Sequence, residues 1–191
     1  MSTAVQRLEF APAFHSYSWM DGKYERHPES HYLDFRIDGR SLLELSDIGG
    51  TYAKDVITKF SAPDSEDAPH FRDELAGRTS PAHPELGVPL YTCAIDGDEL
   101  CGFLAALIEV HDDTVTWSRI AWCSPDWDGP TGGGEIAMSV TDTGLAPMVF
   151  DRDQYEHALA EAVRRVDDLP FDVTEFRGKR FLWPWEWGWR V

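Results

Sequence analysis

The sequence predicts an α+β fold, built as a single domain over residues 1–191. Three observations lead to this prediction. Three strand-like runs separated by short polar turns fall between residues 88 and 123, an amphipathic helical segment covers 151–167, and the length is enough to bury a core without disulfides. Helices placed against one face of an antiparallel sheet are typical of the α+β class. We therefore expect the sheet to be packed by the C-terminal helix.

Two strands are predicted near the N-terminus, at 5–10 and 31–37. In the second strand Leu33, Phe35 and Ile37 occupy alternate positions and therefore share one face, as in a half-buried strand. We expect that face to point into the core.

The next stretch is predicted to hold short elements between turns. Asp38-Gly39 is a hairpin turn signal, and a short helix is expected at 41–45. Apolar residues at four-residue intervals predict a further helix at 52–60. The proline-rich stretch 61–89 is expected to be mostly loop, with a helical turn or two near 67–76.

The strongest signal for strands lies in the middle of the chain. Val88–Ile95, Leu100–Val110 and Val115–Cys123 each have strand composition, and short polar turns separate them. Short turns join antiparallel neighbours, so these runs predict a three-stranded meander. Further strands are expected at 135–140 and 147–150.

The helix predicted over 151–167 has signals at both ends. Asp151 is a preferred N-cap residue, and Gln154 stands three residues later at the capping-box position. Arg164 and Arg165 lie near the C-terminus, where the helix dipole favours cations. The expected buried stripe consists of Tyr155, Ala158, Leu159, Ala162, Val163 and Val166.

The chain is strongly acidic, with a formal net charge of −17. Such a field repels nucleic acid and anionic membranes, and it attracts cations or a basic protein partner. A large charge also serves solubility alone. We therefore expect no nucleic-acid or membrane partner, and a basic protein is the partner that the charge favours.

Cysteine usage and the N-terminal residues predict a cytoplasmic protein. Three cysteines are an odd number, which argues against a disulfide framework and for a reducing compartment. Met1–Phe10 lacks the basic region and apolar stretch of a secretory signal. The longest apolar run, 103–108, is far shorter than a membrane span.

Cys93, Cys101 and Cys123 all fall within the meander and are the first candidates for a metal site. If the residues flanking each turn pair with one another, the pleat puts Cys93 and Cys123 on one face and Cys101 on the other. A shift of one residue in the first turn puts Cys93 beside Cys101 instead. A structural zinc site needs four ligands, usually in closely spaced pairs, so we predict no metal and no cofactor.

The same stretch resembles a group of bacterial proteins of unknown function. The resemblance rests on Pro89–Cys93, Gly97-Asp98, Cys101-Gly102 and Asp113–Trp117, which match a cysteine-containing hairpin before a strand that ends in a tryptophan. An Asp-Gly-Arg turn, Asp38-Gly39-Arg40 here, is a second match. The resemblance implies a bacterial source and no particular activity. This chain lacks the extra cysteine that some members have after the first one, which weakens a metal-site interpretation.

The histidines are the second group of candidates. His27 and His31 have the i, i+4 spacing of two zinc ligands on one helix face, but Pro28 and the strand pattern that follows disfavour a helix. The glutamate between them is also misplaced for a metalloprotease motif. His15, near two aromatic residues, fits a binding pocket and the core equally well.

The C-terminal segment carries an alternating aromatic ladder. As a strand, it projects all its rings from one face, and that face is either the lid of the core or an exposed binding patch. Pro184 on the other face lacks a backbone donor, which favours an edge strand or an irregular extended segment. A further candidate binding residue, Trp127, lies in the glycine-rich loop 124–134. The ladder consists of Phe181, Trp183, Trp185, Trp187 and Trp189.

No catalytic signature names a reaction, so we lean against an enzyme. Asp142-Thr-Gly144 has the form of an aspartic-protease loop, but it lacks the flanking apolar segments and is also an ordinary turn. The leading hypothesis is a non-catalytic acidic cytoplasmic binding protein. A specific version of it is an immunity-like protein that covers a basic partner. The alternatives are a small enzyme or metal-binding domain that uses histidines or cysteines, and an obligate homodimer with an aromatic interface.

Overall fold

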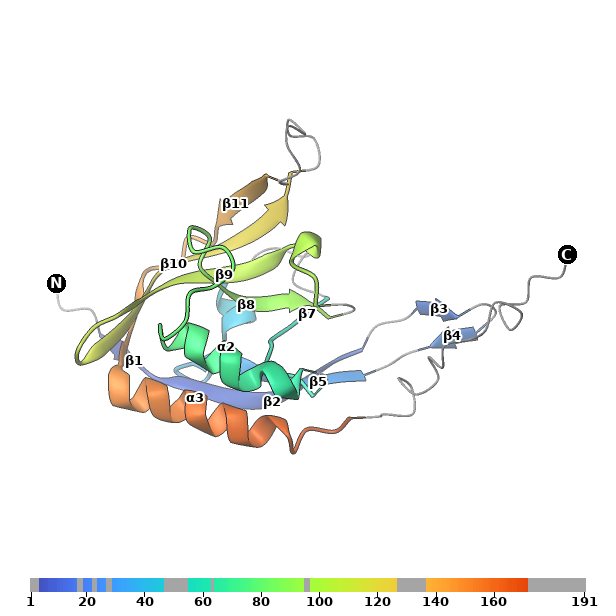
Figure 1. The fold of residues 1–191 in the computed structure, drawn as a ribbon, viewed down its shortest axis with the longest axis horizontal. Helices are drawn as coiled ribbons and strands as arrows, with labels where there is room; N and C mark the ends of the chain where they lie inside the picture. Colours follow the sequence, from blue (N-terminus) through green and yellow to red (C-terminus); the bar gives the residue numbers. More distant parts are fainter. Residues whose placement is uncertain are drawn as a thin grey trace, which may run out of the picture.

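Two β-sheets and a long C-terminal helix make up most of the described chain (Figure 1). The structure is a computed structural model, and the residues that it describes are 4–16, 19–21, 24–26, 29–46, 55–62, 64–94, 97–126 and 137–171. Helices and antiparallel strand pairs occur together, which confirms the predicted α+β class.

The predicted meander is the centre of the larger sheet. β8 (Val88–Cys93), β9 (Phe103–Val110) and β10 (Thr114–Pro125) are joined in sequence order and pair antiparallel. The strand order is β1-β12-β10-β9-β8-β7, and β11 also pairs with β10. β1 runs parallel to β12, so the sheet is mixed. The outer strands are β1 (Val5–Gln6), β7 (Val56–Ile57), β11 (Met138–Asp142) and β12 (Met148–Asp151).

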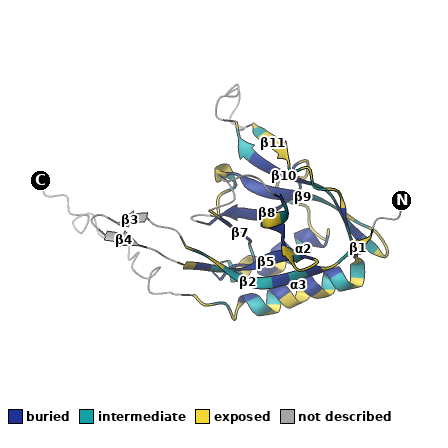
Figure 2. Ribbon diagram, turned by 180° about the vertical axis from the view of Figure 1, so that it is seen from behind, coloured by how far each residue is buried: buried dark blue, intermediate teal, exposed yellow. Residues whose placement is uncertain are grey.

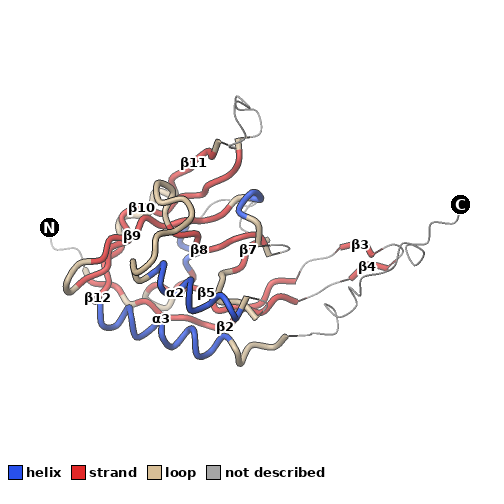
Figure 3. Tube along the Cα trace, viewed as in Figure 1, coloured by secondary structure: helices blue, strands red, loops and turns tan. Residues whose placement is uncertain are grey.

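The smaller sheet is a long N-terminal hairpin with a short third strand. β2 (Leu8–Ser16) pairs antiparallel with β5 (Glu29–Ile37), and β6 (Arg40–Ser41) pairs with the end of β5. The predicted turn joins β5 to β6: Asp38 and Gly39 have φ angles of 50° and 81°, the positive values that a two-residue hairpin turn requires. Between β2 and β5, β3 (Trp19–Asp21) pairs with β4 (Tyr24–Arg26) beyond the body of the molecule (Figure 3).

The predicted C-terminal helix is α3 (Arg152–Val166), which lies along β2 (Figure 1). The side chain of Asp151 accepts a hydrogen bond of 2.9 Å from the Gln154 amide, as an N-cap does. Most of the predicted stripe is buried and faces the sheets (Figure 2). The other helices are α1 (Leu42–Ser46), α2 (Ala68–Leu75) and the 3₁₀ turns η1 (Ser65–Asp67) and η2 (Glu99–Cys101).

One predicted helix is wrong. Where residues 52–60 are described they are extended: β7 pairs with β8, and the following residues pair with β5. The Leu33 amide donates to the Phe60 carbonyl at 2.8 Å, and the Ala62 amide donates to the His31 carbonyl at 3.0 Å. The segment 55–62 therefore connects the edges of the two sheets. Edge strands need hydrogen-bond partners, and this demand outweighs a weak helical pattern.

The core between the sheets and helices is rich in aromatic rings. Phe35 lies at its centre, with ring contacts to Phe10, Phe71, Tyr91 and Trp117 at centroid distances between 5.0 and 6.3 Å. Such tilted and edge-to-face arrangements are the ones that aromatic pairs prefer. Among the described residues, no helix is both long and apolar enough to cross a bilayer.

Candidate functional site

Several residues selected from the sequence lie outside the described ranges. These are His27, Trp127 and the whole aromatic ladder, including Trp183, Trp185, Trp187 and Trp189. The role of His27 as a metal ligand and that of the tryptophans in binding stay predictions.

The two described histidine candidates occupy opposite faces of the smaller sheet. Phe14 pairs with His31 across β2 and β5, and their rings lie 6.0 Å apart. His15 is the next residue on β2, so it points to the other face. His15 Nε2 lies 3.3 Å from Asp55 Oδ1, and His31 Nε2 lies 3.4 Å from Glu29 Oε2. The sheet therefore does not bring these two imidazoles together.

A register shift separates the cysteines. Cys93 lies two residues after Tyr91, which pairs with Leu104 on the core face. Alternate residues of a strand share a face, so Cys93 also lies on the core side. The β9–β10 register shifts by one residue between Trp117 and Arg119, so Cys123 pairs with Phe103. Cys123 therefore lies on the outer face, opposite to the expected side, in a small apolar cluster with Leu86, Phe103 and Ala105. Cys101 is exposed.

The chemistry of these thiols follows from their burial. Burial raises the pKa of Cys123 to about 11, so its sulfur stays protonated, and a protonated thiol is neither a good nucleophile nor a good ligand. Within the described ranges, no three His, Cys, Asp or Glu side chains are grouped so that they could hold a metal ion. The Asp142 loop is a turn, in which the Gly144 amide donates to Asp142 Oδ1 at 2.6 Å.

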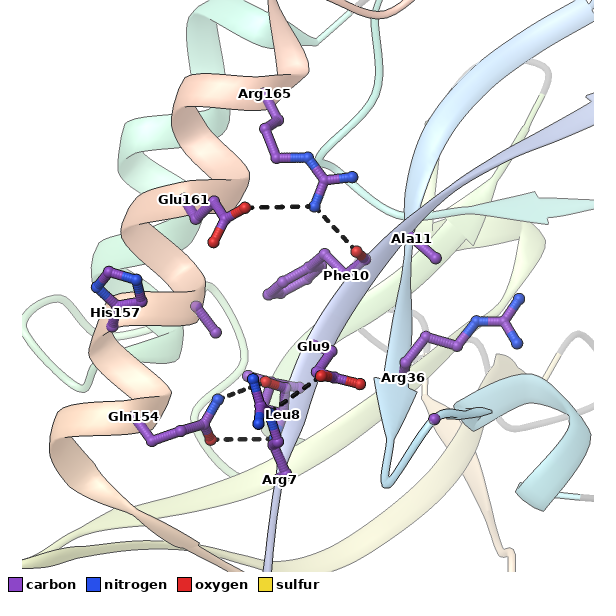
Figure 4. A pocket seen from close by; sticks show the side chains of 12 residues that line it. Arg7, Leu8, Glu9, Phe10, Ala11, Arg36, Gln154, His157, Glu161 and Arg165 are labelled. Atoms are coloured by element: carbon purple, nitrogen blue, oxygen red, sulfur yellow. Dashed lines mark hydrogen bonds and ion pairs between the residues drawn. The ribbon is translucent and has the colours of Figure 1, made fainter.

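Two hollows lined by described residues are relevant to binding. The larger of these is the β2–α3 groove, with a volume of about 520 Å³ (Figure 4). It forms because α3 lies beside the outer edge of β2 and its long polar side chains, rather than backbone, bridge the space. The groove is lined by Arg7, Leu8, Glu9, Phe10, Ala11, Arg36, Gly39, Gln154, His157, Ala158, Glu161 and Arg165.

The polar groups of the β2–α3 groove are largely paired with one another (Figure 4). Gln154 bonds both backbone groups of Leu8: its Oε1 accepts from the amide at 3.1 Å, and its Nε2 donates to the carbonyl at 2.6 Å. Arg165 donates to the Phe10 carbonyl at 3.0 Å and lies 3.8 Å from Glu161. The side chains of α3 therefore take the place of a neighbouring strand along this edge.

The smaller hollow, which we call the acidic cavity, has a volume of about 350 Å³. It lies beside α2, whose buried positions, including Phe71 and Leu75, turn one face of the helix inward. Three acids against one lysine give its lining a formal charge of −2, with histidine neutral. It is lined by Lys59, Asp64, Asp67, His70, Phe71, Glu74, Thr92 and Gly97.

Glu74 is the unusual residue of the acidic cavity. It is only 7% exposed, although glutamate is almost never buried unless it is paired. Its nearest basic group is His70 Nε2 at 3.6 Å, beyond hydrogen-bond distance, and an imidazole is a cation only when protonated. Lys59 Nζ instead lies 3.4 Å from Glu99 Oε1. Among the described residues, no hydrogen-bond donor reaches the Glu74 carboxylate.

A second buried carboxylate, Asp34, has the partners that Glu74 lacks. Its Oδ1 accepts a 2.5 Å hydrogen bond from the Tyr91 hydroxyl, and Arg36 Nε lies 3.0 Å from its Oδ2. Burial raises the pKa of Asp34, and the hydrogen bond from Tyr91 opposes that rise. Because Asp34 is on β5 and Tyr91 on β8, this pair joins the two sheets and has a structural role.

The sequence reasoning missed Glu74, although a signal was present. Position 74 follows Phe71 by three residues and precedes Leu75, so a helix at 67–76 places its side chain beside the buried stripe. No match was found among the protein-family models, the curated proteins or the solved structures. The resemblance to the bacterial group therefore stays a prediction.

Proposed function

We propose that this chain is a non-catalytic cytoplasmic binding protein that covers a basic protein partner, in the manner of an immunity protein. The observation that carries the proposal is the way the described charges are paired. Most described arginine and lysine side chains already contact a carboxylate of the same chain, so they do not offset the remaining acids. These paired cations are Arg7, Arg36, Lys59, Arg72, Arg78, Arg152 and Arg165.

Other acids face solvent without a cation among the described residues. One group gathers where the β9–β10 turn meets the start of α3: the Arg152 amide donates to the Asp113 carbonyl at 3.1 Å, which brings Asp112 and Asp113 close to Asp151 and Asp153. Two segments about forty residues apart in sequence thus place their acidic side chains at the same end of the molecule. Fields of this kind accelerate association with a basic partner and disfavour acidic ones.

The proposal is tested by purifying the untagged full chain from its own host at low salt and without a chelator, followed by native mass spectrometry. We expect a stoichiometric complex with a basic protein that weakens as salt rises. Added lysozyme serves as a control for binding by charge alone, and the host partner must survive at a salt concentration that releases it. Recovery of only a 21.6 kDa monomer, a metal-bound chain or a homodimer contradicts the proposal.

A further inference from the structure

We infer that the acidic cavity receives the side chain of one lysine or arginine from the partner, with Glu74 as its counter-ion. The inference rests on the proposed function and gives it a specific contact. It assigns the cavity beside α2, rather than the larger β2–α3 groove, as the centre of recognition.

Glu74 is a buried carboxylate with few partners among the described residues. Removing a carboxylate from water is costly unless a cation or hydrogen-bond donors replace the lost solvation. Asp34 has such replacements from Tyr91 and Arg36, whereas Glu74 has only the imidazole of His70 at 3.6 Å. Glu74 lines an open cavity, so a cation from outside can supply what the chain itself does not.

The shape and composition of the acidic cavity also suit a long basic side chain. Its volume of about 350 Å³ is in the range that accommodates a small ligand or a long side chain. Phe71 offers an apolar wall for the methylene groups of a long basic side chain. Asp64 and Asp67 extend the negative lining, so a basic group is favoured over an acidic or a neutral one.

Other occupants and the other hollow fit less well. A metal ion needs several ligands grouped around one point, and the described residues contain no such group. Lys59 lines the acidic cavity, but its Nζ is held by Glu99 at 3.4 Å. The β2–α3 groove is larger, yet Gln154 and Arg165 already use their polar groups on the edge of β2.

The experiment is an amide NMR titration of the full chain with three small probes: N-acetyl-arginine methylamide, N-acetyl-lysine methylamide and N-acetyl-glutamine methylamide. We expect one or both basic probes to shift the resonances of Phe71, Glu74 and Thr92, and the neutral probe to leave them unchanged. The response to the two basic probes distinguishes an arginine from a lysine as the natural occupant.

Glu74→Gln and Glu66→Gln form the matched pair of variants. Each removes one negative charge, but Glu66 is exposed on η1 and does not line the acidic cavity. We expect Glu74→Gln to weaken the binding of the basic probe about tenfold, because the buried counter-ion is lost. Glu66→Gln should change the affinity for the probe less than about twofold, because an exposed charge contributes little to binding. Asp67 is exposed and lines the cavity, so we expect Asp67→Asn to cause an intermediate loss of probe affinity. This test does not depend on the folding of the Glu74 variant.

Three results overturn the inference: equal effects of the two glutamate variants, no loss with Asp67→Asn, or shifts spread over the acidic surface without a cluster around Phe71. In those cases a basic partner that still co-purifies leaves the proposed function intact. Conversely, specific probe binding without any basic protein from the host contradicts the proposed function and leaves the cavity as a site for a cationic group. The two failures are therefore distinguishable.

Discussion

The β2–α3 groove and the acidic cavity differ in how their polar groups are satisfied. In the groove, Gln154 and Arg165 bond to the backbone of β2, so the side chains complete the fold. In the cavity, Glu74 is buried with no donor within hydrogen-bond distance among the described residues. Buried polar groups are normally hydrogen-bonded, so a buried carboxylate without a hydrogen-bond donor indicates a role other than stability. The smaller hollow is therefore the better candidate for recognition.

The contrast predicts opposite signs for substitutions. Removing a satisfied polar group should destabilise the protein, because its partner is left without a hydrogen bond. Removing an unsatisfied buried charge should stabilise it. Substitutions at four residues test this difference.

Tyr91→Phe should have the largest effect. It removes the hydroxyl that donates to Asp34 at 2.5 Å and leaves that carboxylate more poorly solvated in the core. We expect a loss of about 1–3 kcal/mol in the free energy of unfolding, measured by urea denaturation at pH 7. Tyr32→Phe is the control, because Tyr32 is also buried but its hydroxyl has no hydrogen bond among the described residues. Equal losses of stability in both variants would show that the hydrogen bond from Tyr91 to Asp34 does not stabilise the fold.

Gln154→Leu should be next. It keeps the bulk of the side chain on α3 but removes both hydrogen bonds to Leu8, for an expected loss of about 1–2 kcal/mol. Glu161→Gln is the control in the same groove, because its contact with Arg165 is long, at 3.8 Å. Hydrogen exchange at the Leu8 amide gives a second measurement, and unchanged protection there would count against the bridging role.

Glu74→Gln should change stability in the other direction. The substitution preserves shape and removes a buried charge whose nearest basic group among the described residues is the His70 imidazole at 3.6 Å, so we expect a gain of about 1 kcal/mol at pH 7. Glu66→Gln, exposed on the preceding turn, should have almost no effect. A clear loss of stability in Glu74→Gln would mean that its carboxylate is satisfied, and the comparison between the two hollows would fail.

Glu156→Gln should have the smallest effect, and its effect should depend on pH. A hydrogen bond from Arg152 at 2.9 Å and the nearby charge of Arg78 lower the pKa of Glu156 in the folded state. Its contribution is therefore present above the unfolded pKa of about 4.3 and is lost as pH falls through the folded value. We expect a loss below about 1 kcal/mol at pH 7 that disappears in acid, measured by urea denaturation across pH. A loss that persists in acid would contradict this account.

The regular parts of the fold could be predicted because their signals are local. The β8–β10 meander follows from apolar runs between polar turns, and α3 follows from its stripe and its Asp151 cap. The role of Gln154 could not be predicted in this way. Its position suggested a capping box, but the strand edge beside it offered both a donor and an acceptor at Leu8.

Composition and local patterns were enough to predict the α+β class, the meander, the C-terminal helix and the large negative charge, because these signals act over a few neighbouring residues. Tertiary contacts, in contrast, pair 55–62 with two sheets, carry Cys123 to the outer face through a register shift, and leave Glu74 buried with the His70 imidazole as its nearest basic group among the described residues. These outcomes depend on which element lies across from each residue. Whether a polar group is satisfied is a property of that neighbour, and no local pattern encodes it.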